Sequence, residues 1–204
     1  MASIYDIKPA FQNLLRPLTR SLATAGVTAN QVTIAAALLS GAVGACIAFN
    51  PHARWPLLAL PGFLFVRMAL NAIDGMLARE HAMKSRLGAV LNEISDVAAD
   101  TALYLPLALV PGFSLWLVVV IAILAIISEM TGVVAIQIGS SRRYEGPMGK
   151  SDRAFVFGLL ALLLGLGVPA GNWLLYVQIL LIVLLTLTIV NRARRALAET
   201  AAVK

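Results

Sequence analysis

Two short stretches concentrate acidic and amide side chains in a chain that is otherwise apolar. The first contains Asn71 and Asp74, three residues apart, and the second contains Asn92 and Asp96, four residues apart. On a helix these spacings place the members of each pair on one face. Charged and amide groups are costly in hydrocarbon, so their presence in an apolar chain indicates a functional site.

The pooled oxygens make a donor set without cysteine or histidine, and such sets suit hard cations such as Mg²⁺, Mn²⁺ or Ca²⁺. Gly75 and Gly88 have no side chains, so a bulky ligand can approach their backbone. Arg79 can donate two hydrogen bonds to a phosphate group. Carboxylates, a divalent ion and an arginine together favour phosphoryl chemistry, in which an acid removes a proton from the attacking hydroxyl. The alternative interpretation is that these polar groups only hold helices together.

The elements that must position these groups are membrane-spanning helices. The chain has 204 residues, of which 60% are apolar and 13% charged, and its mean hydropathy is +0.87. A spanning helix needs roughly 20 mostly apolar residues, and helices satisfy their own backbone in lipid. We predict an all-α, polytopic membrane protein that forms one domain over residues 1–204. Its six transmembrane helices are expected near Gln31–Asn50, Pro56–Ala78, Leu87–Val110, Phe113–Ile138, Ala154–Val168 and Trp173–Val190.

Residues 1–25 form a juxtamembrane segment in which apolar residues recur at helical spacing among charged ones. This pattern predicts an amphipathic helix that lies in the membrane interface, and it lacks the layout of a signal peptide. Pro9 and Pro17 interrupt the pattern, so two short helical pieces are an alternative to one helix.

Lysine and arginine residues lie almost entirely on one side of this topology, with only Arg54 on the other. The distribution predicts that both termini and the two longer loops are cytoplasmic, in an inner (plasma) membrane, with the active site at the cytoplasmic face. The net charge of +6 is therefore a topology signal that also favours anionic lipids, and we expect no nucleic-acid partner. Cys46 stands alone, which excludes a disulfide within the chain and a cysteine-based metal site.

The motif resembles the signature of the CDP-alcohol phosphotransferases, Asp-x2-Asp-Gly-x2-Ala-Arg-x8-Gly-x3-Asp-x3-Asp. All eight positions have the family's spacing and six have its residue types; they are Asn71, Asp74, Gly75, Ala78, Arg79, Gly88, Asn92 and Asp96. Six spans after an interfacial helix is also that family's architecture. The resemblance implies a divalent-metal-dependent transferase of phospholipid synthesis. Such an enzyme moves a phosphatidyl or other phospho-alcohol group from a CDP-linked donor such as CDP-diacylglycerol to a hydroxyl acceptor, and releases CMP.

The resemblance also implies a role for each matching residue. The implied ligands of one or two Mg²⁺ or Mn²⁺ ions are Asp74, Asp96, Asn71 and Asn92, and Asp96 is the implied catalytic base. The implied contacts of the nucleotide and diphosphate are Gly75, Ala78, Arg79, Gly88, Asn30 and Thr33. Four cations before the fifth span are candidate contacts of the acceptor or headgroup, with a topology signal as the alternative: Lys150, Arg153, Arg142 and Arg143.

Asn71 and Asn92 replace two acids of the signature. An amide oxygen can ligate Mg²⁺ but brings no charge, so we expect weak metal binding that a CDP substrate strengthens. Other possibilities are a single metal ion, or Glu93 or Asp100 as a substitute ligand. Asp100 could equally be polar packing.

Two alternatives to an active transferase are a catalytically inactive CDP-lipid-binding protein and, less favoured, a small transporter. Transporter sites lie near the bilayer midplane, whereas this polar cluster lies toward one face. The sequence allows a homodimer and leaves the acceptor alcohol open. Arg67 either extends toward the headgroups or pairs with an acid of the cluster, and Glu129 is expected to be buried against a neighbour.

Overall fold

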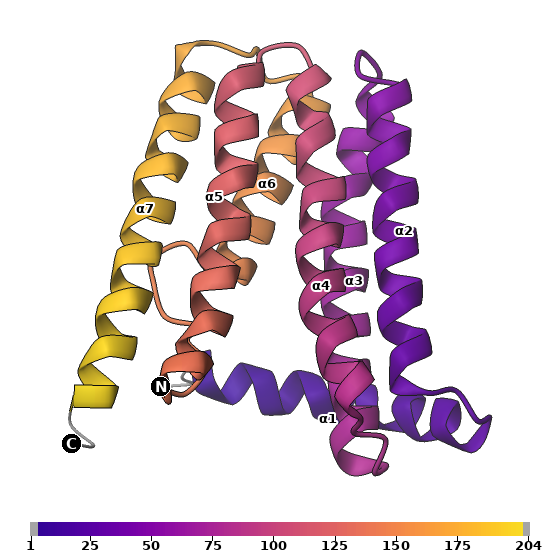
Figure 1. Cartoon of the computed structure of the whole chain (residues 1–204). Coiled ribbons are helices and arrows are strands. Elements are labelled where there is room, and N and C mark those ends of the chain that lie inside the picture. Colours follow the sequence, from indigo (N-terminus) through magenta and orange to yellow (C-terminus); the bar gives the residue numbers. More distant parts are fainter. Residues whose placement is uncertain (1–3, 202–204) are drawn as a thin grey trace. The chain divides into compact units, whose positions relative to one another are not determined.

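The computed structural model describes residues 4–201, and its regular structure is helical throughout that range (Figure 1). The all-α prediction is therefore confirmed for these residues. In chain order the elements are α1 (Ile4–Thr24), α2 (Ala29–Phe49), α3 (Arg54–Glu80), α4 (Arg86–Tyr104), η1 (Leu105–Leu109), α5 (Leu115–Val134), η2 (Ala135–Ile138), α6 (Lys150–Gly165) and α7 (Asn172–Ala201).

Four helical segments within the described residues are long and apolar enough to cross a membrane, so the chain is an integral membrane protein. They are α2, α3, the continuous stretch Leu115–Ile138 and α7. The helix α4 falls outside this set; its sequence includes Arg86, Glu93, Asp96 and Asp100. The helix α6 is also outside it, with 16 residues. Six spans stay a prediction, because α4 and α6 are the two helices in which polar groups or shortness dilute the hydropathy signal.

The helices of the signature begin at defined caps. At the start of α2 the Thr28 N–H donates to Gln31 Oε1 over 2.9 Å, and the Gln31 N–H donates to Thr28 Oγ1 over 3.3 Å. This reciprocal arrangement is a capping box. At the start of α4 the Gly88 N–H donates to Ser85 Oγ over 2.9 Å. Local sequence therefore fixes where both helices start.

Contacts divide the described chain into two units. The first unit comprises the described part of Met1–Ala42 together with Gly62–Asp100, and the second comprises Val43–Pro61 with the described part of Thr101–Lys204. The prediction of one domain over residues 1–204 stays a prediction.

In the first unit, α1 lies crosswise to α2 and α3 (Figure 1). Its Leu15 and Leu22 pack against a buried cluster formed by Ala29, Val32, Ile73 and Leu77. Although Pro9 and Pro17 lie inside α1, the helix is continuous, so one helix replaces the alternative of two pieces. Burial of one apolar face offsets the hydrogen bonds that the prolines remove. Its position at a membrane interface stays a prediction.

In the second unit, small residues allow close helix packing. A Cβ atom at Gly44 of α2 would collide with the carbonyl oxygen of Ala102 of α4, so this contact requires glycine. Tyr104 and Phe157 stack with ring centroids 4.4 Å apart, which joins α4 to α6.

Candidate functional site

All residues that the resemblance assigns to the donor and metal lie in the first unit. They come from three helices and the segments that start them: Asn30, Thr33, Asn71, Asp74, Gly75, Ala78, Arg79, Gly88, Asn92 and Asp96. The positions span more than sixty residues of sequence, so their collection in one unit is a consequence of the fold.

Asp74 is held by a hydroxyl from a neighbouring helix. The Thr33 hydroxyl of α2 donates to Asp74 Oδ2 of α3 over 2.8 Å, and only 5% of Asp74 is exposed. A buried carboxylate without partners would be strongly destabilising, so this hydrogen bond contributes to keeping Asp74 in place. Thr33, one of the implied nucleotide contacts, is therefore in direct contact with an acid of the signature.

Two glycines of the signature make room for polar side chains of the protein itself. A Cβ atom at Gly88 would lie 2.7 Å from Asn30 Oδ1, and a Cβ atom at Gly75 would lie 3.2 Å from Arg79 Nη2. The amide of Asn30 and the guanidinium of Arg79 thus lie over backbone that larger residues would cover. The sequence predicts that a ligand approaches these glycines, and the structure adds this second role.

Asp96 lies beside a buried arginine. Arg67 Nη2 donates to the Asp96 carbonyl oxygen over 3.2 Å and lies 3.8 Å from Asp96 Oδ1. Arg67 Nη1 lies 2.6 Å from Asp100 Oδ1. Of the two alternatives for Arg67, pairing with acids of the cluster is correct. Its position in an apolar helix, one turn before Asn71, was the sequence signal for this role.

The donor set fits a hard divalent ion in kind but carries little charge. Among residues 4–201, no three His, Cys, Asp or Glu side chains come together as a metal-binding group. An ion at the signature would therefore need the amide oxygens of Asn71 and Asn92 besides the carboxylates of Asp74 and Asp96. Metal ligation by these residues stays a prediction, and so does Asp96 as base.

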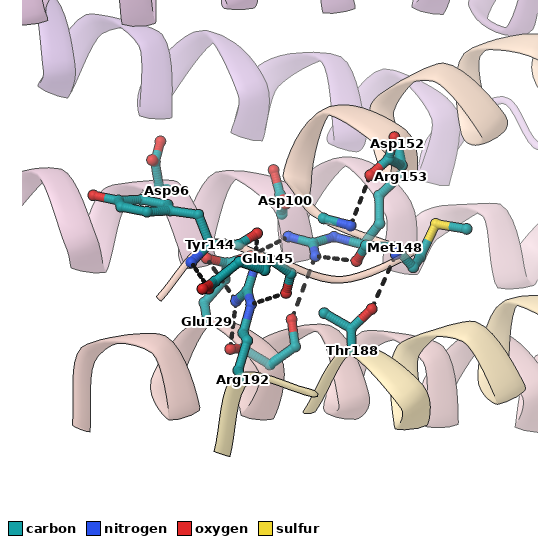
Figure 2. Close-up of polar contacts among 12 residues, drawn as sticks. Asp96, Asp100, Glu129, Tyr144, Glu145, Met148, Asp152, Arg153, Thr188 and Arg192 are labelled. Atoms are coloured by element: carbon teal, nitrogen blue, oxygen red, sulfur yellow. Dashed lines mark hydrogen bonds and ion pairs between the residues drawn. The ribbon is translucent and has the colours of Figure 1, made fainter. Parts of the chain in front are cut away.

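The second unit contains a buried carboxylate surrounded by arginines (Figure 2). Glu129 of α5 lies 3.1 Å from Arg153 Nη2, 3.4 Å from Arg192 Nη1 and 3.7 Å from Arg142 Nη2. Arg153 and Arg192 are each 1% exposed. One carboxylate thus meets three guanidinium groups, and these ion pairs offset part of the cost of burying the charges. The sequence predicted a neighbour for Glu129 but not three of them.

These arginines also hold the loop that precedes α6. Arg192 donates to the carbonyl oxygens of Glu145 and Tyr144, each over 3.2 Å, and Arg153 Nη1 donates to that of Met148 over 3.4 Å (Figure 2). Arg153, a candidate acceptor contact, therefore points into the protein. Because such bonds satisfy buried carbonyl groups, they stabilise the loop.

The other candidate acceptor residues have different environments. Arg143 pairs with Glu145 over 3.1 Å and also with Glu199. Arg142 lies over the Tyr144 ring at 4.2 Å, and Lys150 opens α6 and is partly exposed. The roles of all four cations toward an acceptor stay predictions, with Arg142 and Lys150 the more accessible pair.

Glu145 in this loop is held in its charged form. Burial raises the pKa of its carboxyl, but hydrogen bonds from its own backbone N–H, from Arg143 and from the Tyr144 N–H lower the pKa by more. The net pKa lies below the usual value for glutamate, so the carboxylate remains a partner for the loop arginines at neutral pH.

The chain resembles known proteins over nearly its whole length. It is 43% identical to the inner membrane protein YnbA of Escherichia coli (strain K12) over 201 residues, which is 98% of each chain. Its fold is similar to that of phosphatidylinositol phosphate synthase (PgsA1) from Mycobacterium tuberculosis. With CDP-DAG bound, that structure gives a TM-score of 0.74 at 22% identity and covers 88% of this chain and 92% of its own. The structure with manganese and citrate gives the same TM-score and identity and covers 88% and 87%.

The family comparison settles what the motif indicated. The profile of the CDP-alcohol phosphatidyltransferases matches residues 26–198, which include the whole signature and the arginine cluster around Glu129. The chain therefore belongs to the CDP-alcohol phosphatidyltransferase family.

Proposed function

We propose that this protein transfers a phosphatidyl group from CDP-diacylglycerol to a hydroxyl acceptor and releases CMP. The observation that carries the proposal is the assembly of the signature: Thr33 bonds Asp74, and Asn30 lies over Gly88. Two residues one turn apart on α2 thus meet the acid of α3 and the glycine of α4. Binding of CDP-DAG and of manganese by the PgsA1 structures supports the same donor and a divalent ion here.

In the proposed reaction, Asp96 accepts the proton of the acceptor hydroxyl. The acceptor oxygen then forms a bond to the phosphorus of the diacylglycerol phosphate, while the bond from that phosphorus to the bridging oxygen breaks. CMP leaves with the electron pair. A bound divalent ion would offset the charge that develops on the diphosphate. Asp96 is suited to the role because 24% of its side chain is exposed, whereas Asp74 is buried.

We propose further that the acceptor carries an anionic group such as a phosphate. The support is the cluster of cations in the second unit, where the arginines around Glu129 are Arg142, Arg153 and Arg192. Buried positive charge of this kind favours an anion nearby. We assign this contact to Arg142 and Lys150. Arg153 contributes indirectly, through its ion pair with Glu129.

The proposed setting is the cytoplasmic face of an inner membrane, with six spans and both termini in the cytoplasm. Resemblance to an inner membrane protein supports the setting. The distribution of lysine and arginine supports the orientation.

The proposal is tested with purified protein, CDP-diacylglycerol, Mn²⁺ or Mg²⁺ and a panel of acceptors. The panel pairs glycerol with glycerol 3-phosphate and inositol with inositol phosphate, and adds serine. We expect CMP release together with a new lipid, detected by mass spectrometry, and faster turnover with the phosphorylated member of a pair. Asp96→Asn should abolish both signals.

A second function is favoured by a specific observation, the two amides at signature positions. A protein that binds CDP-diacylglycerol without turnover would show donor binding but no CMP with any acceptor. In that case Asn71→Asp combined with Asn92→Asp should restore the missing ligand charge and with it CMP release. CMP release by the unmodified protein with any acceptor rejects this second function.

A further inference from the structure

Arg67 is a buried cation that lies beside Asp96 and Asp100 in the first unit. Only 3% of the residue is exposed. Its two terminal nitrogens divide their contacts: Nη1 lies 2.6 Å from Asp100 Oδ1, and Nη2 contacts both the carbonyl and the carboxylate of Asp96. An arginine held by two acids one helical turn apart is fixed in orientation as well as position.

The two acids are not equivalent partners. Asp100 is the tight one, with a side chain that is 6% exposed and a contact of 2.6 Å. Asp96 is the loose one, because its carboxylate lies 3.8 Å from the guanidinium and its side chain is 24% exposed. Asp100 therefore anchors Arg67, and a second cation at the Asp96 carboxylate would leave this anchor contact in place.

We propose that Arg67 is a resident counter-cation that competes with the divalent ion for Asp96. The inference rests on the proposed function and takes Asp96, the proposed base, as a ligand of the divalent ion as well. A guanidinium and a divalent ion attract the same carboxylate and repel each other. Asn71 and Asn92 replace two acids of the signature and so reduce the negative charge of the site. Arg67 reduces that charge further.

Two consequences follow for the protein without a donor. The affinity for a divalent ion is lower than the ligand oxygens alone would give. Asp96 nevertheless stays oriented, because Arg67 donates to its carbonyl oxygen and lies beside its carboxylate. Arg67 is thus a positioning residue: it acts on the reaction through Asp96.

The test is an Mn²⁺ titration followed by electron paramagnetic resonance, with no CDP-diacylglycerol present. Arg67→Met should bind Mn²⁺ about tenfold more tightly than the unmodified protein, since the guanidinium that repels the ion beside the Asp96 carboxylate is gone. Arg67→Lys should keep the original affinity. Arg86→Met is the matched control, because Arg86 is exposed at the start of α4 and solvent screens its charge.

Removal of Arg67 leaves Asp100 buried without its anchor partner, so a second comparison protects the test against misfolding. Arg67→Met combined with Asp100→Asn is compared with Asp100→Asn alone, and thermal unfolding confirms that both are folded. The double variant should again bind Mn²⁺ about tenfold more tightly, because the same repulsion is removed. Equal or weaker binding after loss of Arg67, in folded protein, overturns the inference.

The readout also separates this inference from the proposed reaction. Tighter Mn²⁺ binding by Arg67→Met supports competition for Asp96 even in a protein that releases no CMP, and in that case the transferase proposal alone fails. CMP release by the unmodified protein, together with unchanged Mn²⁺ affinity in Arg67→Met, supports the transferase and rejects the role of Arg67.

Discussion

At the scale of single residues, the polar groups of the site are held by partners from other helices, as Thr33 holds Asp74 and Asp100 holds Arg67. Asp74 stands out because an acid in an apolar helix is rare, but its contact with Thr33 joins residues 41 positions apart. Arg67 likewise stands out, while only the fold shows that Asp100 is its tight partner. A partner across helices depends on packing and rotation, which one-dimensional spacing does not contain.

The hydrogen bond from Thr33 gives a prediction for the donor site. Thr33→Val keeps the shape of the side chain and leaves the buried Asp74 oxygen without this hydroxyl, at a cost of about 1–3 kcal/mol. We expect kcat/KM for CMP release to fall about tenfold or more. Thr33→Ser keeps the hydroxyl and should retain most of the activity. Equal losses in the two variants would mean that shape, and not the hydrogen bond, matters at this position.

At the scale of elements, hydropathy locates the helices and misplaces their polar ends. The fifth predicted span begins at Ala154, but α6 begins at Lys150. Gly149 and Asp152 cap this helix, and its first turn is polar, so a hydropathy pattern does not include that turn. The sixth predicted span ends at Val190, yet α7 continues to Ala201 and buries Arg192. Pro106 lies in the first turn of the 3₁₀ helix η1, where a proline is tolerated, and α4 ends just before it at Tyr104.

Two glycines on α2 give a matched pair of substitutions. Gly41→Ala meets open space and should stabilise the protein by about 0.5–1 kcal/mol, because alanine favours a helix over glycine. Gly44→Ala forces a methyl group against the Ala102 carbonyl and should destabilise it by about 1–3 kcal/mol. Thermal unfolding in one detergent measures both. A Gly41→Ala loss as large as that of Gly44→Ala would contradict this packing.

At the scale of the whole molecule, the composition identifies a membrane protein, and the signature identifies its family. The number of spans is less certain from sequence, since α4 combines a membrane-length helix with the polar residues of the site. Polar residues in a membrane helix lower its mean hydropathy, and mean hydropathy is the signal by which such a helix is located in a sequence. The identity of the acceptor cannot be predicted from the sequence for a different reason. Arg153 and Arg192 bind the loop before α6 and Glu129, so the presence of an arginine does not by itself indicate a ligand contact.

The six-span topology predicts which loops face the cytoplasm. If α4 and α6 both cross the membrane, the loop that contains Pro147 lies inside and the turn that contains His52 lies outside. In a Cys46→Ser background, a membrane-impermeant thiol reagent added to intact cells should label His52→Cys but spare Pro147→Cys. After cell lysis it should label both. Labelling of Pro147→Cys in intact cells would instead fit spans only at α2, α3, α5 and α7.

The most direct test of the central claim measures whether Asp74 and Asp96 hold a cation against the diphosphate of the donor. Electron–nuclear double resonance of the Mn²⁺-loaded protein detects phosphorus close to the ion. Addition of CDP-diacylglycerol should produce a ³¹P coupling that is lost in Asp74→Asn and in Asp96→Asn, because each variant removes a charged ligand. A Mn²⁺ signal that does not change on addition of the donor, or a ³¹P coupling that survives both substitutions, would contradict the account.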